Sequence, residues 1–204
     1  MQKLAIFGAG GHGAVIADIL EALKISYLVI DDTPQTKQLN GIKAITKEDF
    51  LALKNTKEYG VVLAIGNNAV RKNLYDFFIQ KGFCLPSVIH PSAIISKSAK
   101  IADAAVVFPN AVINARANIG IGAIINTASV VEHDCNVGAF AHIAPRSTLC
   151  GSVSVGCVTH IGAGSVVIEG KSVGEHCVIG AGSVVINPIP SFKRIVGNPA
   201  KKEI

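Results

Sequence analysis

A histidine between two carboxylic acids is the strongest candidate for chemistry in this chain. His133 is preceded by Glu132 and followed by Asp134. A carboxylate beside an imidazole fixes the tautomer of the ring and raises its basicity, which suits a general base that removes a proton during catalysis. A surface histidine in an acidic turn is the alternative interpretation. The secondary structure around His133 bears on which of the two interpretations is correct.

The sequence around His133 repeats every six residues. Every sixth residue from Ile89 to Val185 is Ile, Val or Leu, and most positions four residues further on hold a small or β-branched residue. An amphipathic helix repeats at about 3.6 residues and a simple strand at two. Six-residue units are typical of a parallel β-helix, in which each aliphatic side chain points into a narrow prism. We therefore expect a hexapeptide-repeat β-helix over residues 86–204.

The repeat also predicts which residues are neighbours. Three hexapeptides form one coil in such folds, so residues eighteen apart should lie above one another, about 4.8 Å apart. His133 then lies between Ala115 and Gly151, and these small residues leave space for a ligand beside the ring. His142 and His160 should also be neighbours. They are open to three interpretations: a structural ladder, a pair that orients a ligand, or two metal ligands.

A metal site is a competing hypothesis for these histidines. A catalytic zinc needs three convergent ligands and an open fourth position. His133 lies half a coil from His142 and should face a different side of the prism. A site shared between subunits of a trimer, as in β-helical carbonic anhydrases, is the remaining possibility. We expect no metal cofactor.

Residues 1–85 lack the six-residue period and form a separate domain. Strand-like and helix-like segments alternate there, which predicts an α/β, half-Rossmann-like domain with a small parallel sheet. Its ligand crevice should lie at the carboxyl ends of the strands. We expect strands at Lys3–Phe7, Tyr27–Ile30 and Val61–Ile65, helices at residues 14–23 and 69–80, and a capped helix start at Thr46.

Glycine-rich or acidic residues follow each predicted strand. Residues 8–13 match the pattern G-x-G-x-x-G, Asp31 and Asp32 follow at a distance that suits a ribose, and Gly66 follows the third strand. Half of a dinucleotide fold suits one nucleotide, such as a nucleotide-sugar whose diphosphate meets the loop and the helix N-terminus. His12, inside the loop, could touch the diphosphate or the sugar. A tight strand–helix turn is the simpler interpretation of the glycines.

The composition narrows the class of partner. The chain has 204 residues with a formal net charge of +5. Its charges are scattered, which argues against nucleic acid and favours an anionic small molecule. No apolar run is long enough to span a membrane, and we recognise no signal peptide. The five cysteines include no CxxC pair, which indicates reduced thiols, so we expect a cytoplasmic protein.

These motifs jointly resemble the bacterial sugar acetyltransferases of the sialic-acid O-acetyltransferase type. The greatest similarity is to the UDP-4-amino-sugar N-acetyltransferases of bacillosamine-type biosynthesis. The resemblance covers essentially the whole chain and rests on the glycine loop, the acidic pair, Ala64–Asn68 and Asn126–Asp134. It implies a left-handed β-helix, a homotrimer, acetyl-CoA bound between adjacent β-helices, and a UDP-amino-sugar held by the N-terminal domain.

The resemblance also implies roles for individual residues. His133 matches the general base, and Asp134 matches the carboxylate beside it. Related UDP-amino-sugar enzymes have Glu at that second place and GDP-amino-sugar enzymes have Asp, so a GDP-amino-sugar substrate is an alternative, as is sialic-acid-type O-acetylation. Contacts with acetyl-CoA are implied for His142, Gly151, Ala163 and Ala181. Contacts with the sugar nucleotide are implied for Gly10, Gly11, His12, Asp31, Asp32, Gly66 and Asn126.

Two questions remain open at this level. The tail from Arg194 to Lys201 resembles the terminal loop of the family, whose cations could meet CoA phosphates, but a polar cap on the last coil is an equally good interpretation. A module that binds a nucleotide-sugar without catalysis, or a β-helical metalloenzyme, would represent a different functional class.

Overall fold

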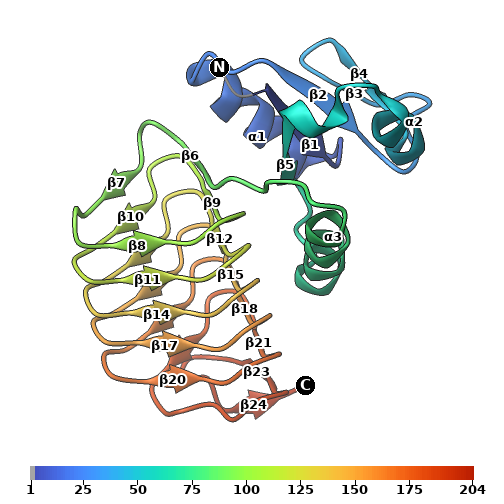
Figure 1. Cartoon of the computed structure of the whole chain (residues 1–204). Helices are drawn as coiled ribbons and strands as arrows, with labels where there is room; N and C mark the ends of the chain where they lie inside the picture. The colour runs from blue at the N-terminus through green and yellow to red at the C-terminus, as the bar shows by residue number, and fades with distance from the viewer. Residues whose placement is uncertain (1–2) are drawn as a thin grey trace. The chain divides into compact units, whose positions relative to one another are not determined.

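The chain folds into two compact units. The computed structural model describes residues 3–204, and it divides the chain into Met1–Pro91 and Ser92–Ile204. Figure 1 labels the elements of both units. The sequence predicts a boundary after residue 85. Strand β6 (Val88–Ile89), which packs against helix α1 (Gly11–Ala22), falls within the first of the two compact units.

The first unit is a small α/β domain. Its sheet has the strand order β3-β4-β2-β1-β5, and β1 lies between β2 and β5 and runs parallel to both. The buried residues of β1 and β5 form the middle of the core. The elements are β1 (Lys3–Phe7), α1 (Gly11–Ala22), β2 (Tyr27–Ile30), β3 (Gln38–Leu39), β4 (Ile42–Ile45), α2 (Lys47–Ala52), the 3-10 helix η1 (Thr56–Glu58), β5 (Tyr59–Leu63), α3 (Asn68–Gln80) and β6.

Most of the predicted elements of this unit are confirmed, with three differences. Helix α1 begins at Gly11, inside the glycine loop, because the Ala14 N–H already donates to the Gly10 carbonyl at 3.0 Å. Strand β5 begins two residues earlier than predicted. The antiparallel β3–β4 hairpin was missed because β3 has only two residues and the apolar run of β4 was not recognised as a strand. Its Asn40-Gly41 turn, with both φ angles positive, was a usable hairpin signal.

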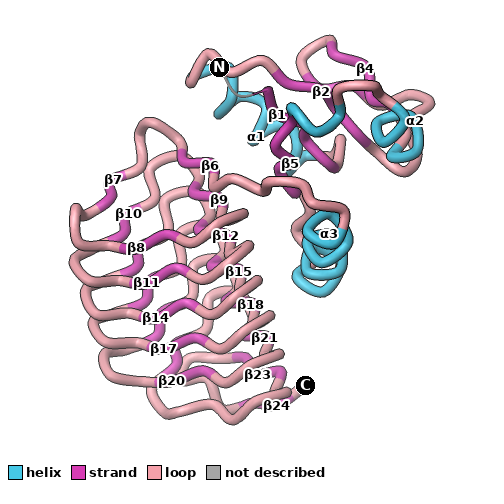
Figure 2. The backbone as a smooth tube through the Cα atoms, in the orientation of Figure 1, coloured by secondary structure: helices cyan, strands magenta, loops and turns pink. Residues whose placement is uncertain are grey.

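The second unit is a parallel β-helix of short strands joined by tight turns (Figure 2). Each two-residue strand from β7 to β19 pairs in parallel with the strand eighteen residues further on, as in the register His142↔His160. This confirms the predicted coil length. The strands form three sheets: β7-β10-β13-β16-β19-β22, then β8-β11-β14-β17-β20, and a third that includes β9-β12-β15-β18-β21-β23-β24. Their bounds are β7 (Ile94–Ile95), β8 (Lys100–Ile101), β9 (Val106–Val107), β10 (Val112–Ile113), β11 (Asn118–Ile119), β12 (Ile124–Ile125), β13 (Val130–Val131), β14 (Asn136–Val137), β15 (His142–Ile143), β16 (Thr148–Leu149), β17 (Ser154–Val155), β18 (His160–Ile161), β19 (Val166–Val167), β20 (Ser172–Val173), β21 (Val178–Ile179), β22 (Val184–Val185), β23 (Arg194–Val196) and β24 (Lys202–Glu203).

The six-residue repeat accounts for the interior of the β-helix. Every aliphatic residue of the repeat from Val107 to Val185 is buried. The small residues four positions later are also buried, and several are serines whose hydroxyls bind backbone carbonyls. Ser147 Oγ lies 2.8 Å from the Ala144 carbonyl oxygen and 2.9 Å from that of Gly162. A larger side chain there would have to displace the next coil, so small residues are required.

A second feature repeats with the same period. Every sixth residue from Ala104 to Gly182 has a positive φ, although most of these residues are not glycine. The left-handed conformation turns the chain at each corner. It also sets the direction in which each corner side chain leaves the backbone. One corner of successive coils carries Arg116, Asp134, Ser152 and Gly170.

The C-terminal segment closes the last coil. Strand β23 pairs in parallel with β21 and antiparallel with β24. The ammonium group of Lys193 lies 2.8 Å from the carboxylate of Glu203, which holds the two ends of this hairpin together. The tail therefore serves as a polar cap, and contact of its cations with CoA phosphates stays a prediction. Over residues 3–204 we find no helix with the length and apolar character that a bilayer span requires.

Candidate active site

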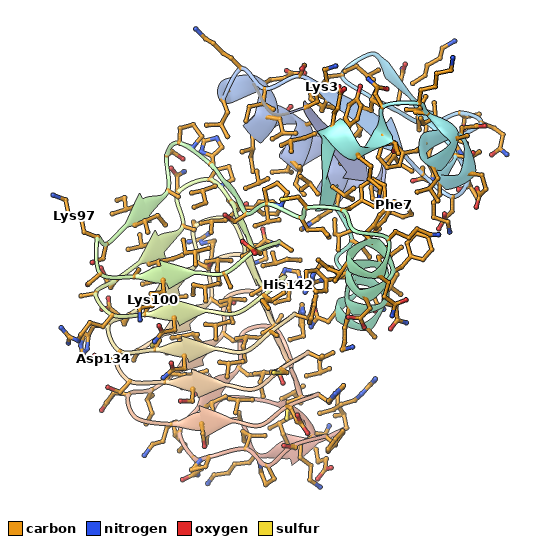
Figure 3. All side chains as sticks on the ribbon, in the orientation of Figure 1. Lys3, Phe7, Lys97, Lys100, Asp134 and His142 are labelled. Carbon is orange, nitrogen blue, oxygen red and sulfur yellow. The ribbon has the colours of Figure 1, made fainter. Side chains whose placement is uncertain are left out.

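His133 lies on an exposed corner of the β-helix, in the turn between β13 and β14. Its Nδ1 atom is 2.9 Å from Oδ2 of Asp134, and its backbone N–H donates to the Glu132 carboxylate at 3.3 Å. Figure 3 shows Asp134 at the outer edge of the coil. An ionised carboxylate only accepts hydrogen bonds, so Nδ1 carries the ring proton and Nε2 keeps its lone pair. This is the tautomer that a general base needs.

The column predicted around His133 is present. The Asp134 N–H donates to the Ala115 carbonyl at 3.0 Å, and the Ser152 N–H donates to the His133 carbonyl at 2.9 Å. A Cβ atom on Gly151 would lie 2.6 Å from Cε1 and 2.8 Å from Nε2 of the His133 ring. The ring therefore rests against Gly151 and fills part of the space expected for a ligand. Any side chain at that position would displace the imidazole.

Arg116 joins this cluster, and the sequence analysis missed it. Its Nε donates to Asp134 Oδ1 at 2.6 Å and its Nη2 donates to Asp134 Oδ2 at 2.8 Å. The hydrogen bonds from Arg116, and then the one from His133, hold the pKa of the Asp134 carboxyl far below its ordinary value. Asp134 is therefore an ionised carboxylate at neutral pH. The eighteen-residue spacing between Arg116 and Asp134 was the signal that would have revealed this pair.

A second cluster contains His142 and Asn126. Asn126 Oδ1 accepts the Thr127 N–H at 2.7 Å, which turns the amide nitrogen Nδ2 toward His142 Nε2 at 2.9 Å. Because Nδ2 can only donate, Nε2 accepts and the His142 proton is on Nδ1. The ring meets that of His160 edge to face, with centroids 4.8 Å apart. His142 lies in a different sheet from the strands that flank His133, so one chain does not bring the two histidines together.

Ala163 and Ala181 lie on successive coils of the β-helix. Both are exposed, and the Gly182 N–H donates to the Ala163 carbonyl at 2.9 Å. Two small exposed residues in one column leave the backbone accessible to an extended ligand. Their contact with pantetheine stays a prediction.

The glycines of the first unit fall into two groups. A Cβ atom on Gly8 would lie 2.7 Å from the Ala64 carbonyl oxygen, and one on Gly13 would overlap the Gly8 carbonyl. These two glycines are required by the tight strand–helix turn, as the simpler interpretation proposed. Gly10, Gly11 and Gly66 are different, because an added Cβ would meet nothing within 4 Å. The open space beside these three is compatible with a ligand that approaches the backbone closely.

The two acidic residues after β2 differ in their surroundings. Asp31 is buried and accepts the Ala9 N–H at 2.9 Å, the Thr33 N–H at 2.9 Å and the Lys37 ammonium at 2.6 Å. Burial raises the pKa of Asp31, but these hydrogen bonds outweigh it, so the net pKa is lowered. Asp31 thus anchors the glycine loop. Asp32 is exposed, 3.6 Å from the ammonium of Lys47, and is the more accessible partner for a ribose.

A fully buried arginine beside the carbonyls that follow β5 was also missed by the sequence analysis. Arg71 on α3 donates to the carbonyls of Ile65 and Gly66 at 2.9 and 3.3 Å, and to Asn68 Oδ1 at 2.8 Å. Burial lowers its pKa to about 10, so it stays charged at neutral pH. Burial, and then the charge of Arg71, lowers the pKa of His12 to about 4. His12 is therefore a neutral imidazole at pH 7.

This shift predicts how the stability of the protein depends on pH. The unfolded chain protonates His12 below about pH 6.5, whereas the folded chain does so only near the lowered pKa of about 4. The free energy of unfolding should therefore fall as the pH drops from 6.5 to 4, by up to about 3 kcal/mol. Urea unfolding of the wild type and of His12→Gln at pH 7.5 and 4.5 measures this. Equal pH dependence in both proteins would contradict the shift.

Within residues 3–204, no three His, Cys, Asp or Glu side chains come together in an arrangement that could hold a metal ion. One ring nitrogen of each histidine is engaged by a side chain, Nδ1 of His133 by Asp134 and Nε2 of His142 by Asn126.

Comparison with known proteins gives the class of protein to which this chain is similar. Residues 3–78 match the PglD N-terminal domain model. The acetyltransferase domain of PglB from Neisseria gonorrhoeae is 36% identical, with a TM-score of 0.93, and the match covers 98% of this chain and 99% of that one. A perosamine N-acetyltransferase variant from Caulobacter crescentus, with a histidine replaced by asparagine and with CoA and GDP-perosamine bound, is 35% identical over 98% of this chain and 95% of that one, with a TM-score of 0.94.

A further relative is similar to this chain in sequence over a shorter stretch of residues. The UDP-N-acetylbacillosamine N-acetyltransferase of Bacillus subtilis is 38% identical over 114 residues, which is 52% of this chain and 51% of that protein. The match thus spans about half the length of this curated relative. The fold is that of the hexapeptide-repeat acetyltransferases, with a Rossmann-like N-terminal sheet and a left-handed parallel β-helix, as predicted. The chain belongs to the bacterial sugar acetyltransferase family.

Proposed function

We propose that this protein transfers an acetyl group from acetyl-CoA to the 4-amino group of a UDP-linked amino-deoxy-sugar. The observation that carries the proposal is the His133–Asp134 pair, with Nδ1 engaged at 2.9 Å and Nε2 left to accept a proton. The relatives support the co-substrate, since the PglB acetyltransferase domain has also been solved with acetyl coenzyme A. The open glycines Gly10, Gly11 and Gly66 support a sugar nucleotide in the first unit.

The proposed reaction requires no covalent enzyme intermediate. The neutral amine attacks the thioester carbonyl carbon, and a new C–N bond forms as the carbonyl oxygen gains negative charge. Nε2 of His133 takes a proton from the amine nitrogen, while the Gly151 N–H stabilises the oxyanion. The C–S bond then breaks, and the CoA thiolate takes the proton from His133. In this scheme His142, protonated at Nδ1 and fixed by Asn126, lies at the thioester.

The identity of the nucleotide is the finer part of the proposal. The curated relative carries UDP-N-acetylbacillosamine in its name, whereas the Caulobacter enzyme was solved with GDP-perosamine. Asp134, at the place where UDP-amino-sugar enzymes have Glu, favours the GDP alternative, while the similarity to bacillosamine-type enzymes favours UDP. The homotrimer and the cytoplasmic location also stay predictions.

An activity assay tests the proposal directly. Purified protein is mixed with acetyl-CoA and with matched UDP- and GDP-4-amino-sugars, and the release of free CoA thiol is followed with a thiol reagent. We expect turnover with the UDP-amino-sugar that exceeds turnover with its GDP counterpart and with the 4-hydroxy analogue. Preference for the GDP-sugar would support the alternative substrate. Absence of turnover with every amino-sugar would contradict N-acetylation.

Binding measurements separate the other functional classes. Calorimetric titration should detect binding of both acetyl-CoA and a UDP-amino-sugar. Binding of the sugar nucleotide alone would favour a sensor module. Stoichiometric zinc or iron in the purified protein, with loss of activity on chelation, would favour a metalloenzyme.

A further inference from the structure

The side chain of Arg116 is directed at the carboxylate beside His133. Both Arg116 and Asp134 are left-handed corner residues, with φ angles of 60° and 61°, and they occupy the same corner of successive coils. Their side chains therefore leave the backbone in the same direction, about one strand spacing apart. The Arg116 backbone is itself held, since its N–H donates to Ser98 Oγ at 3.1 Å.

The contact is bidentate, and one of its oxygens is shared with the histidine. Asp134 Oδ1 accepts from Arg116 Nε at 2.6 Å, and Oδ2 accepts from Nη2 at 2.8 Å. The same Oδ2 accepts from His133 Nδ1 at 2.9 Å. A planar guanidinium that binds both oxygens fixes the plane of the carboxylate, which a single hydrogen bond from the histidine would not do.

We propose that Arg116 is a positioning residue for acetyl transfer, which holds the Asp134 carboxylate in the plane from which Oδ2 meets Nδ1 of His133. The inference rests on the proposed function, in which His133 is the general base. Arg116 acts only through Asp134 and touches neither substrate in this scheme. Its removal should lower kcat and leave the KM values for both substrates nearly unchanged.

The role in catalysis can be distinguished from a role in stability. The Arg116 side chain is 65% exposed, and exposed ion pairs stabilise proteins little. Arg116→Ala should therefore fold normally but lower kcat about tenfold, less than the loss of the base itself. Arg116→Lys keeps the charge but loses the bidentate geometry, so an intermediate kcat is expected. Guanidinium ion at millimolar concentration should recover part of the activity of Arg116→Ala and none of Arg116→Lys.

The pH profile gives a further readout. The charged or titratable groups at the Asp134 carboxyl are Arg116 and His133, with Glu132 and Cys135 adjoining in the chain. Hydrogen bonds from Arg116 lower the pKa of Asp134, so removal of Arg116 raises that pKa toward the ordinary carboxyl value. The Asp134 carboxyl should then protonate at a higher pH in Arg116→Ala, which an NMR titration profile of its side-chain carboxyl carbon measures. Lys3→Ala, which breaks the exposed Lys3–Glu58 pair of the first unit, is the matched control and should leave the profile unchanged.

A double-mutant cycle tests whether Arg116 acts on catalysis through Asp134. If Arg116 acts through Asp134, then Arg116→Ala should cause no further loss of kcat in the Asp134→Asn background. Additive losses, or a wild-type kcat in Arg116→Ala, would overturn the inference. Measurement of His133→Ala in parallel keeps the two proposals apart. An inactive His133→Ala beside a fully active Arg116→Ala rejects only the role of Arg116, whereas an active His133→Ala rejects the base.

Discussion

Replacement of His133 by alanine should lower kcat by about 10²- to 10⁴-fold. The imidazole is the group that accepts the amine proton in the proposed reaction, and Asp134 holds its Nδ1 at 2.9 Å. The acetyl group can still be bound without it, so the KM for acetyl-CoA should change little. Steady-state kinetics with both substrates varied gives the two parameters separately.

The structure suggests controls for this variant. The His133 side chain is 55% exposed on a corner of the β-helix, so its removal should not affect the core, and the melting temperature should be unchanged. Asp134→Asn keeps the shape of the carboxylate but not its charge, and we expect a milder loss, because Asp134 tunes the base without replacing it. A near-normal rate for His133→Ala would exclude the proposed general base.

The second large effect is expected at Gly151. A Cβ atom there would lie 2.6 Å from Cε1 and 2.8 Å from Nε2 of His133, so a valine would push the imidazole out of its position. The backbone of Gly151 is not left-handed, so a side chain there would not strain the backbone. We therefore expect Gly151→Val to fold with an unchanged oligomeric state and to lose about 10²-fold or more in kcat, comparable to the loss of an oxyanion donor.

Two comparisons make the Gly151 prediction specific. Gly151→Ala should already reduce kcat, because the collision involves the Cβ atom itself. Ser165→Val is the contrasting variant: Ser165 is fully buried, and its hydroxyl donates to the Gly180 carbonyl at 2.9 Å. Its replacement should lower the melting temperature, with kcat little changed in the protein that remains folded. Wild-type turnover by Gly151→Val would show that catalysis does not require the His133 imidazole in its position beside Gly151.

The six-residue period made much of the second unit predictable. Identical spacing of the aliphatic residues determines which side chains face the interior, and every aliphatic residue of the repeat from Val107 to Val185 is buried. The coil length of eighteen residues then predicted the neighbours of His133 and the His142–His160 contact. In the first unit, the strands Lys3–Phe7 and Tyr27–Ile30 were predictable because continuous apolar runs mark buried parallel strands.

Several features of the candidate sites were not predictable in this way. Strand β3 of the β3–β4 hairpin has only two residues, and a charged residue such as Arg71 is rarely buried, although Arg71 lies seven residues before the buried Phe78 on the same face of α3. The burial of Arg71 depends on the carbonyls of Ile65 and Gly66, which the fold brings to it. The Asp31 contacts with Ala9 and Lys37 likewise join segments that are distant in sequence.

The sequence by itself therefore determined the hexapeptide β-helix, the α/β unit before it and the adjacency of His133 and Asp134. Each follows from covalent neighbours or from a regular period. The tertiary structure decided the ring's position against Gly151, the bidentate contact of Arg116 with Asp134 and the neutral state of His12. The eighteen-residue period places Arg116 above Asp134 and Gly151 beside His133, but the contacts themselves depend on the directions in which the corners project their side chains and on how deeply packing buries each group.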